Sequence, residues 1–137
     1  MNEYACALII DHGRLLLGRR APYRKSYASK WDLIGGRIET GETQLEALTR
    51  ELQEEIAIIP QTPAYFDSLP DPHVAPQDPP LYHFFRVEAW SGTPCINNHE
   101  HTELALVPLS RAGTWPDLAL QEYSDLFRRL AAFYSVP

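Results

Sequence analysis

Hydrophobic residues along the first third of the chain are spaced as in β-strands. Residues 4–10 are almost continuously apolar, which is typical of a buried strand. Residues 11–13 then provide a turn, and residues 14–18 form a second apolar stretch, so we expect a β-hairpin. A short apolar run at 31–34 follows a polar, basic loop at 21–30 and is closed by two glycines.

The clearest helix is predicted for residues 43–56. Thr43 and Glu46 have the spacing of a capping box, in which each side chain bonds the other residue's backbone N–H. Four apolar residues recur at helical spacing and predict one buried stripe: Leu45, Leu48, Leu52 and Ile56.

The second half of the chain predicts short strands and one more helix. Seven of the twelve prolines fall within residues 60–80, which excludes a long helix or a central strand there and leaves one short strand near 64–68. Residues 81–90 and 104–109 predict further strands, separated in part by a polar loop at 97–103. A C-terminal amphipathic helix is indicated by Leu120, Tyr123, Phe127, Leu130 and Tyr134.

This order of elements predicts an α+β fold, within the broad α/β class, in which a mixed β-sheet is sandwiched between helices. The length suits a single domain over residues 1–137. Hydrophobic residues make up 45% and charged residues 22%, which excludes a disordered or collagen-like chain. No apolar run approaches the roughly 18 residues of a membrane span, and the N-terminus lacks a secretory signal. We therefore expect a cytoplasmic protein without membrane contact.

Charge is unevenly placed along the chain. The net charge of −6 disfavours binding of a nucleic-acid polymer. Six basic residues and no acid lie within 14–30, whereas six glutamates and two arginines lie within 37–58. A basic stretch followed by an acidic one suits an anionic ligand held through a divalent cation. Two solvated faces would give the same pattern, so charge alone does not decide between them.

Three glutamates of the predicted helix lie on one arc beside its buried stripe. Glu51 is three residues from Glu54 and four from Glu55, so the side chains are neighbours on the helix. Like charges at these spacings destabilise a helix by roughly 0.2–0.5 kcal/mol per pair. Arg50 is the one cation in the segment. A hard cation such as Mg²⁺ or Mn²⁺, which prefers carboxylate oxygens, would relieve the repulsion. An exposed acidic helix face is the alternative interpretation.

The residues around these glutamates form a longer pattern, G-x5-E-x7-R-E-U-x-E-E-x-G-U, in which U is bulky and apolar. It is matched by Gly36, Glu42, Arg50, Glu51, Leu52, Glu54, Glu55 and Ile58. If each of the charged or glycine matches has a chance of about 5%, coincidence is on the order of 10⁻⁸ per start position. The pattern resembles the Nudix box of the Nudix hydrolases. Residues 19–36 resemble the approach to that box in the MutT branch.

Two residues depart from the family pattern. Ala57 stands where the box has a glycine, and alanine resists the left-handed conformation of many helix ends, so we expect a different exit from the helix. Ile34 stands where a proline is common before the glycine pair. Neither departure removes a carboxylate.

The resemblance implies Mg²⁺- or Mn²⁺-dependent hydrolysis of the diphosphate linkage in a nucleoside diphosphate joined to a further group. It assigns the metal to Glu51, Glu54, Glu55 and the carbonyl of Gly35. Glu51 and Glu54 are also candidates to position or deprotonate the attacking water. Arg50 is expected to hold the glutamates in place, supported by Gly36 and Glu42.

Residues outside the box are further candidates. A late glutamate serves as a metal ligand or base in several Nudix enzymes. We favour Glu103 over Glu100 for this role, because Glu103 directly precedes an apolar strand that can hold it rigidly. Arg19 and Arg20 are candidates to clamp phosphate, since arginine binds it in bidentate geometry.

The MutT resemblance favours a small nucleotide, most of all a nucleoside triphosphate, as substrate. The alternative is a Nudix-fold nucleotide-binding or sensor domain without turnover. The sequence predicts no oligomeric state.

Overall fold

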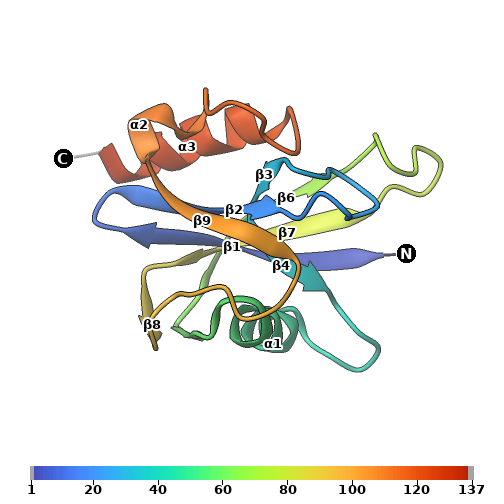
Figure 1. Cartoon of the computed structure of the whole chain (residues 1–137), viewed down its shortest axis with the longest axis horizontal. Helices are drawn as coiled ribbons and strands as arrows, with labels where there is room; N and C mark the ends of the chain where they lie inside the picture. The colour runs from blue at the N-terminus through green and yellow to red at the C-terminus, as the bar shows by residue number, and fades with distance from the viewer. Residues whose placement is uncertain (1, 136–137) are drawn as a thin grey trace.

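The computed structural model describes residues 2–135 and has three layers, with a mixed β-sheet between helices (Figure 1). This confirms the predicted fold class. The strands of the main sheet are β1 (Glu3–Asp11), β2 (Arg14–Arg20), β3 (Trp31–Asp32), β4 (Ile34–Arg37), β6 (Ala64–Pro70), β7 (Leu81–Val87) and β9 (His101–Pro108). A small second sheet pairs β5 (Ile59–Gln61) with β8 (Ala89–Ser91). The helices are α1 (Gln44–Ile56), α2 (Leu109–Ala112) and α3 (Tyr123–Ser135).

Strand β1 lies at the centre of the main sheet. Its first half pairs antiparallel with β4 on one side, and most of its length pairs parallel with β7 on the other. Its last residues form the predicted hairpin with β2, which in turn pairs with β3 and β9. Since β1 is covered on both faces, its continuous apolar run is the pattern expected of a fully buried strand.

The two faces of β1 contribute to two separate cores. Cys6, Leu8 and Ile10 belong to the core under α2 and α3. Ala5, Ala7 and Ile9 belong to the core under α1. The two alanines on the α1 side are small, so that helix packs close to the sheet. This close approach places the glutamates of α1 beside the strands.

Helix α1 begins as predicted and differs from prediction at its first hydrophobic position. Glu46 N donates to Thr43 Oγ1 at 3.1 Å and Thr43 N donates to Glu46 Oε1 at 2.9 Å, which confirms the capping box. The predicted stripe is wrong at Leu45, which is 45% exposed. Leu45 lies in the first turn, outside the core that begins at Ala47.

The expected change of exit at the end of α1 is also wrong. Ala57 adopts the left-handed conformation, with φ 61° and ψ 35°, and its N–H donates to Gln53 O at 3.2 Å. A non-glycine residue in this region costs about 1–2 kcal/mol. The turn delivers Ile58 into the core, where it is 1% exposed, and burial of such a side chain contributes about 1.5–3 kcal/mol. Core burial thus outweighs local strain.

Two strand boundaries differ from the expected ones. Strand β9 begins at His101, three residues before the expected start, because pairing with β2 continues through a register shift. The expected strand at 81–90 is divided between β7 and β8, which lie in different sheets. Ile34 pairs with Ala7 and is fully buried, so the residue that departs from the family pattern serves as core packing.

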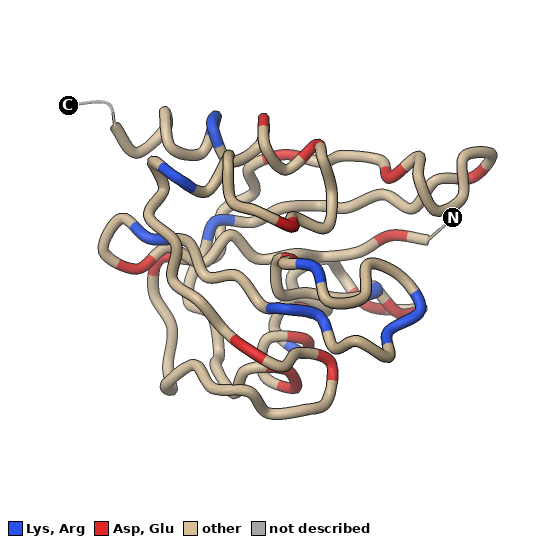
Figure 2. Tube along the Cα trace, turned by 45° about the horizontal axis from the view of Figure 1, so that its top comes forward, with Lys and Arg blue, Asp and Glu red and all other residues tan. Residues whose placement is uncertain are grey.

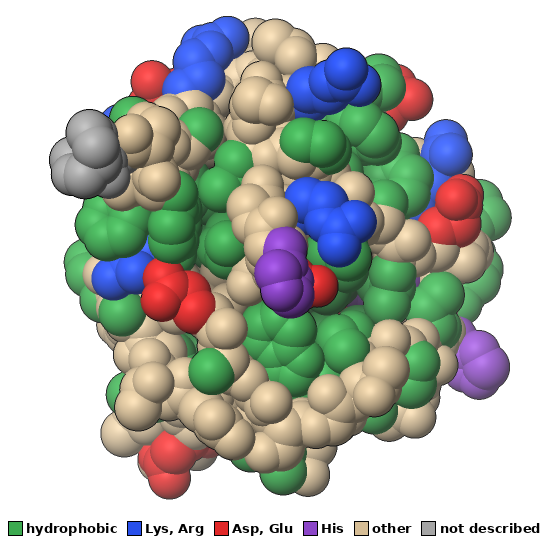
Figure 3. Space-filling view, turned by 90° about the vertical axis from the view of Figure 1, so that its left-hand side faces the viewer, with side chains coloured by type: hydrophobic (Ala, Val, Ile, Leu, Met, Phe, Trp, Pro, Cys, Tyr) green, Lys and Arg blue, Asp and Glu red, His purple; other side chains and the backbone are tan. Residues whose placement is uncertain are grey.

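Basic residues gather in the loop between β2 and β3, whereas at the end with the β1–β2 turn the charges are scattered (Figure 2 and Figure 3). Figure 2 shows several basic positions along the loop between β2 and β3, and this loop contacts the polar segment before β9 through an Arg24–Glu100 ion pair. At the end that carries the β1–β2 turn, charged side chains are scattered among hydrophobic and polar ones (Figure 3).

No helix within residues 2–135 is long and apolar enough to cross a membrane.

We expect Ala57→Gly to stabilise the protein by about 1 kcal/mol, because glycine adopts the left-handed conformation without the Cβ penalty. Urea unfolding should show a higher midpoint with an unchanged slope. The matched control is Ala47→Gly inside the same helix, which should destabilise by about 1 kcal/mol or more. A loss of stability in Ala57→Gly comparable to that in the control would contradict the account of the helix end.

Candidate active site

Two glycines let β4 fit between β1 and α1. A Cβ atom on Gly35 would lie 2.2 Å from the carbonyl oxygen of Ala5. A Cβ atom on Gly36 would lie 2.2 Å from the carboxyl carbon of Glu51. The glycine pair therefore leaves the space that the Glu51 carboxylate occupies against the strand.

Arg50 holds the carboxylates of Glu42 and Glu51 in place. It donates to both oxygens of Glu42, at 2.7 and 2.9 Å, and to Glu51 Oε1 at 2.8 Å. It also donates to the carbonyl oxygen of Arg37 at 3.0 Å and lies 3.5 Å from a carboxylate oxygen of Glu54. The hydrogen bond from Arg50 lowers the pKa of Glu42 to about 2, so Glu42 stays ionised. The guanidinium of Arg50 thus links the loop that carries Glu42 to strand β4 and to helix α1.

Three carboxylates meet at the centre of the site, and they are Glu51, Glu55 and Glu100. Each offers an oxygen, and these atoms all lie within 4.8 Å of one another. Burial raises the pKa of Glu51, and burial together with the neighbouring Glu100 raises the pKa of Glu55 well above its usual range. Burial by itself would raise the pKa of Glu100. Hydrogen bonding with Glu55 and the positive charge of Arg24 outweigh it, so the pKa of Glu100 is lowered. The cluster is therefore strained as long as it holds only anions.

Glu55 is the most deeply buried of these acids, at 2% exposure. Among residues 2–135, no hydrogen-bond donor contacts its Oε2 atom. The ring of His101, itself buried, lies 3.6 Å away from the other oxygen, measured from Nδ1 to Glu55 Oε1. An unpartnered buried carboxylate oxygen is costly, so this atom is a candidate ligand for a cation. The donor set is entirely oxygen, which is the set that Mg²⁺ and Mn²⁺ prefer.

Glu100 reaches the helix glutamates because its loop docks on the end of α1. The N–H groups of Cys95 and Asn97 donate to the carbonyls of Ile56 and Glu55 at 3.1 and 2.9 Å. The Asn97 side chain donates to the Gln53 carbonyl at 3.3 Å. The last carbonyls of a helix lack partners within the helix, so this loop satisfies them.

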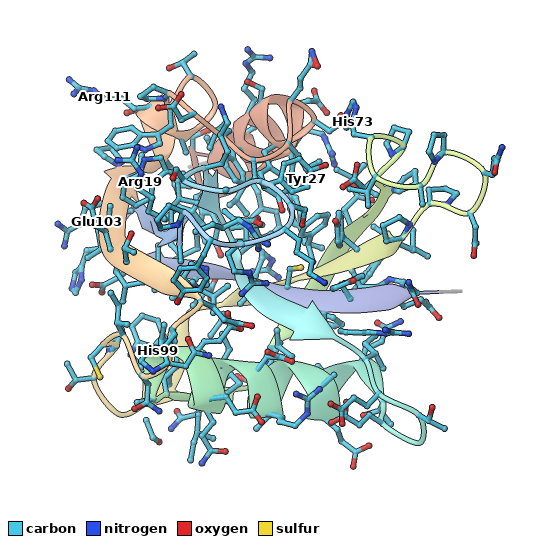
Figure 4. All side chains as sticks on the ribbon, turned by 45° about the vertical axis from the view of Figure 1, so that its right-hand side comes forward. Arg19, Tyr27, His73, His99, Glu103 and Arg111 are labelled. Carbon is cyan, nitrogen blue, oxygen red and sulfur yellow. The ribbon has the colours of Figure 1, made fainter. Side chains whose placement is uncertain are left out.

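Glu103, the residue that we favoured from the sequence, lies elsewhere. Its side chain is 58% exposed and faces Arg19, with Arg19 Nη1 to Glu103 Oε1 at 3.6 Å (Figure 4). The pairing of β2 with β9 jumps from Arg19–Glu103 to Arg20–His101, so Thr102 is an extra residue. Such a bulge resets the alternation of side chains between the two faces of the strand. His101 therefore points to the cluster and Glu103 does not.

Of the other predicted site residues, some line the central cavity and some lie outside it. Arg20 lines the central cavity, where its Nη1 lies 3.5 Å from Asp32 Oδ2. Arg19 lies over the ring of Trp31, at 5.7 Å from its centroid, and away from the cavity. Glu54 lies beside Arg50 with its side chain 56% exposed, outside the three-carboxylate cluster. Gly35 lines the cavity next to that cluster.

The cavity, of about 190 Å³, has two chemically different parts. Glu51, Glu55 and Glu100 line one part. The remainder contains aromatic and apolar residues, among them Tyr4, Cys6, Tyr82, Leu120 and Tyr123, together with polar ones such as Arg20, Ser26 and Asp32. Asp32 is the carboxylate in this second part, where it accepts the hydroxyl of Tyr123 at 2.7 Å. The arrangement accommodates a molecule that has a charged end and a flat, largely apolar end.

Two loops form the rim of the cavity, and a buried carboxylate joins them. Asp71 is fully buried and accepts the hydroxyls of Tyr27, at 2.6 Å, and Tyr82, at 3.0 Å. Tyr27 belongs to the loop between β2 and β3, and Asp71 to the proline-rich loop that also carries His73 (Figure 4). His73 in turn pairs with Glu122, just before α3, at 2.5 Å. These contacts fix the shape of the apolar part.

The chain is similar in sequence to known proteins of one family. Residues 2–130 match the NUDIX domain family. The chain is 39% identical over 88 residues to the 8-oxo-dGTP diphosphatase of Escherichia coli (strain K12), covering 61% of this chain and 63% of that protein. It thus spans slightly less than two thirds of that relative. It is 32% identical over 113 residues to the oxidized purine nucleoside triphosphate hydrolase of Danio rerio, covering 80% and 70%.

Solved structures share the whole fold. A MutT NUDIX hydrolase from Burkholderia pseudomallei superposes with a TM-score of 0.79 at 23% identity, covering 98% of both chains. The E. coli ORF135 protein superposes with a TM-score of 0.82 at 28% identity, covering 98% of this chain and 91% of that one. Since the family match extends over nearly all of the described residues, the protein belongs to the Nudix family, and its resemblance is to the MutT branch.

Proposed function

We propose that the protein is a Mg²⁺- or Mn²⁺-dependent Nudix hydrolase that cleaves the diphosphate linkage of a nucleoside triphosphate. The observation that carries the proposal is the three-carboxylate cluster, with its unpartnered oxygen, at one part of a cavity whose other part contains aromatic residues. A polyphosphate bound through a divalent cation suits the first part, and a nucleobase suits the second. The names of the relatives, an 8-oxo-dGTP diphosphatase and an oxidized purine nucleoside triphosphate hydrolase, support the same substrate class.

The cation would be held by Glu51, Glu55 and Glu100, with Glu54 and the Gly35 carbonyl as the additional ligands that the family resemblance implies. A divalent ion at this position neutralises phosphate charge and lowers the pKa of water. This role requires the carboxylates to be deprotonated. Because the pKa values of Glu51 and Glu55 are raised, we expect activity to increase from acidic towards alkaline pH.

The chain's own residues would then divide the remaining tasks. Arg50 donates to Glu51, which orients that carboxylate and partly offsets the rise in its pKa that burial causes. Following the family resemblance, we propose that Glu54, which lies beside Arg50 and outside the three-carboxylate cluster, accepts the proton of the attacking water. The water oxygen forms a bond to phosphorus as the bond to the leaving phosphate oxygen breaks. Arg20, which lines the cavity, is a candidate to bind phosphate, whereas Arg19 is directed elsewhere.

We propose that residues 1–137 act as one domain. Both cores pack on opposite faces of the same strand, β1, and the family match covers residues 2–130. The proposal involves a small nucleotide and no nucleic-acid polymer.

A direct assay tests the proposed function. Incubation with single nucleoside triphosphates, including oxidized purine forms, should release a nucleoside monophosphate and pyrophosphate in the presence of Mg²⁺. Stripping metal and adding excess EDTA should abolish the release, and Mn²⁺ should restore it. Nucleotide binding without product over the whole panel would instead favour a sensor domain. Undiminished turnover in EDTA would contradict the metal requirement.

A pair of variants decides which late glutamate serves the site. Glu100→Gln should lower kcat by about 10²-fold or more, because it removes a carboxylate from the cluster. Glu103→Gln makes the same chemical change on an exposed strand position and should alter kcat less than about twofold. Both are measured at saturating Mg²⁺. An inactive Glu103→Gln beside an active Glu100→Gln would reverse the assignment.

A further inference from the structure

The basic loop between β2 and β3 brings one cation directly to the carboxylate cluster. Arg24 Nη1 lies 3.0 Å from Glu100 Oε1, and both side chains are partly buried, at 27% and 38% exposure. One backbone hydrogen bond joins the two segments, from Ala21 N to Glu100 O at 2.9 Å, and a turn within the loop, closed by Arg24 N donating to Ala21 O at 3.1 Å, places Arg24 beside it. The Tyr23 hydroxyl adds a bond to the His99 carbonyl. The contact between loop and cluster is therefore built into the fold.

Among the described residues, the side chain of Arg24 has fewer bonding partners than those of Arg50 and Arg20, the other arginines near the cavity. Arg50 is engaged by Glu42, Glu51, Glu54 and the Arg37 carbonyl. Arg20 pairs with Asp32 and donates to the Ser26 carbonyl at 2.9 Å. Within residues 2–135, the guanidinium of Arg24 has Glu100 as its ion-pair partner. Arg24 also lines the cavity together with the three carboxylates.

The Arg24–Glu100 pair competes with a divalent cation in two ways. The guanidinium takes up an oxygen of Glu100 that belongs to the proposed ligand set. Its positive charge also repels a second cation at the same carboxylate. A bound polyphosphate offers Arg24 a better partner, because arginine and phosphate form bidentate, charge-assisted hydrogen bonds.

We propose that Arg24 couples nucleotide binding to metal binding by changing partners. In the free protein it pairs with Glu100. When a nucleotide enters the cavity it pairs with the phosphates instead and leaves Glu100 to the metal. The inference rests on the proposed function and assigns it an additional residue, Arg24, that binds phosphate and positions Glu100. Coupling between two binding sites is reciprocal, so each ligand should tighten the binding of the other.

The exchange predicts opposite changes in two affinities for Arg24→Gln. Without nucleotide, the variant should bind Mn²⁺ about fivefold more tightly than the wild type, since the competing guanidinium is gone. At saturating Mg²⁺, it should bind a non-hydrolysable α,β-methylene nucleoside triphosphate about fivefold or more weakly, since a phosphate ligand is lost. Calorimetric titration measures both affinities in the absence of turnover. Lys25→Gln is the matched control, because it removes the same charge from an exposed neighbour and should change neither affinity beyond twofold.

A second background makes the test specific for Glu100. In Glu100→Gln protein, adding Arg24→Gln should leave Mn²⁺ affinity unchanged, because the competition has already been removed. Weaker Mn²⁺ binding by Arg24→Gln, or an unchanged affinity for the analogue, would overturn the inference. Wild-type protein that hydrolyses nucleotides with Mg²⁺ while Arg24→Gln behaves like Lys25→Gln refutes the coupling alone. Wild-type protein that binds neither Mn²⁺ nor analogue refutes the proposed function itself.

Discussion

Repulsion among three carboxylates is the interaction around which this site is built. Glu51, Glu55 and Glu100 come within 4.8 Å of one another in a partly buried setting, where ionised groups are costly. Acidic side chains without a role in a site are mostly exposed to solvent. Here the glycine at 36 makes room for one of them, and Glu55 is buried with an oxygen that no described residue satisfies. A divalent cation bound among the three carboxylates would relieve this repulsion.

The surrounding fold holds the carboxylates together against this repulsion. Small residues on the α1 side of β1 let the helix approach the sheet, and burial of Leu48, Leu52 and Ile56 anchors it there. Arg50 neutralises part of the charge and ties the helix to the box loop. The loop before β9 bonds the free carbonyls at the end of α1 and so delivers Glu100. The α1 core therefore supplies the rigidity that positions these groups for chemistry.

Much of this architecture was predictable, because it follows from local chemistry. The capping box of α1, the buried hairpin and the glutamates at helical spacing depend on residues close together in the sequence. The errors arose where distant contacts decide. Ala57 takes a strained conformation because Ile58 is buried after it, and Leu45 is exposed because the buried part of α1 begins at Ala47. The placement of Glu100 in the cluster and of Glu103 outside it likewise depends on the pairing of β9 with β2, where the extra residue Thr102 lies, and not on a local pattern.

We expect the metal-free cluster to lower the free energy of unfolding and a bound divalent cation to restore it. The pKa values of Glu51 and Glu55 are raised above the ordinary value of 4.5, so the folded protein binds more protons than the unfolded chain. In EDTA, the stability that these protons provide is present at pH below 4.5 and is lost as the pH rises through the raised pKa values. Mg²⁺, which binds the deprotonated form, should restore stability at neutral and alkaline pH.

The most direct test is the midpoint of urea unfolding as a function of pH, with EDTA and with Mg²⁺, for wild type and Glu55→Gln. The account predicts that wild-type stability in EDTA falls more steeply above pH 4.5 than that of Glu55→Gln, and that Mg²⁺ reverses the fall in the wild type alone. Identical pH profiles for the two proteins, or a wild-type profile that Mg²⁺ does not change, would contradict it.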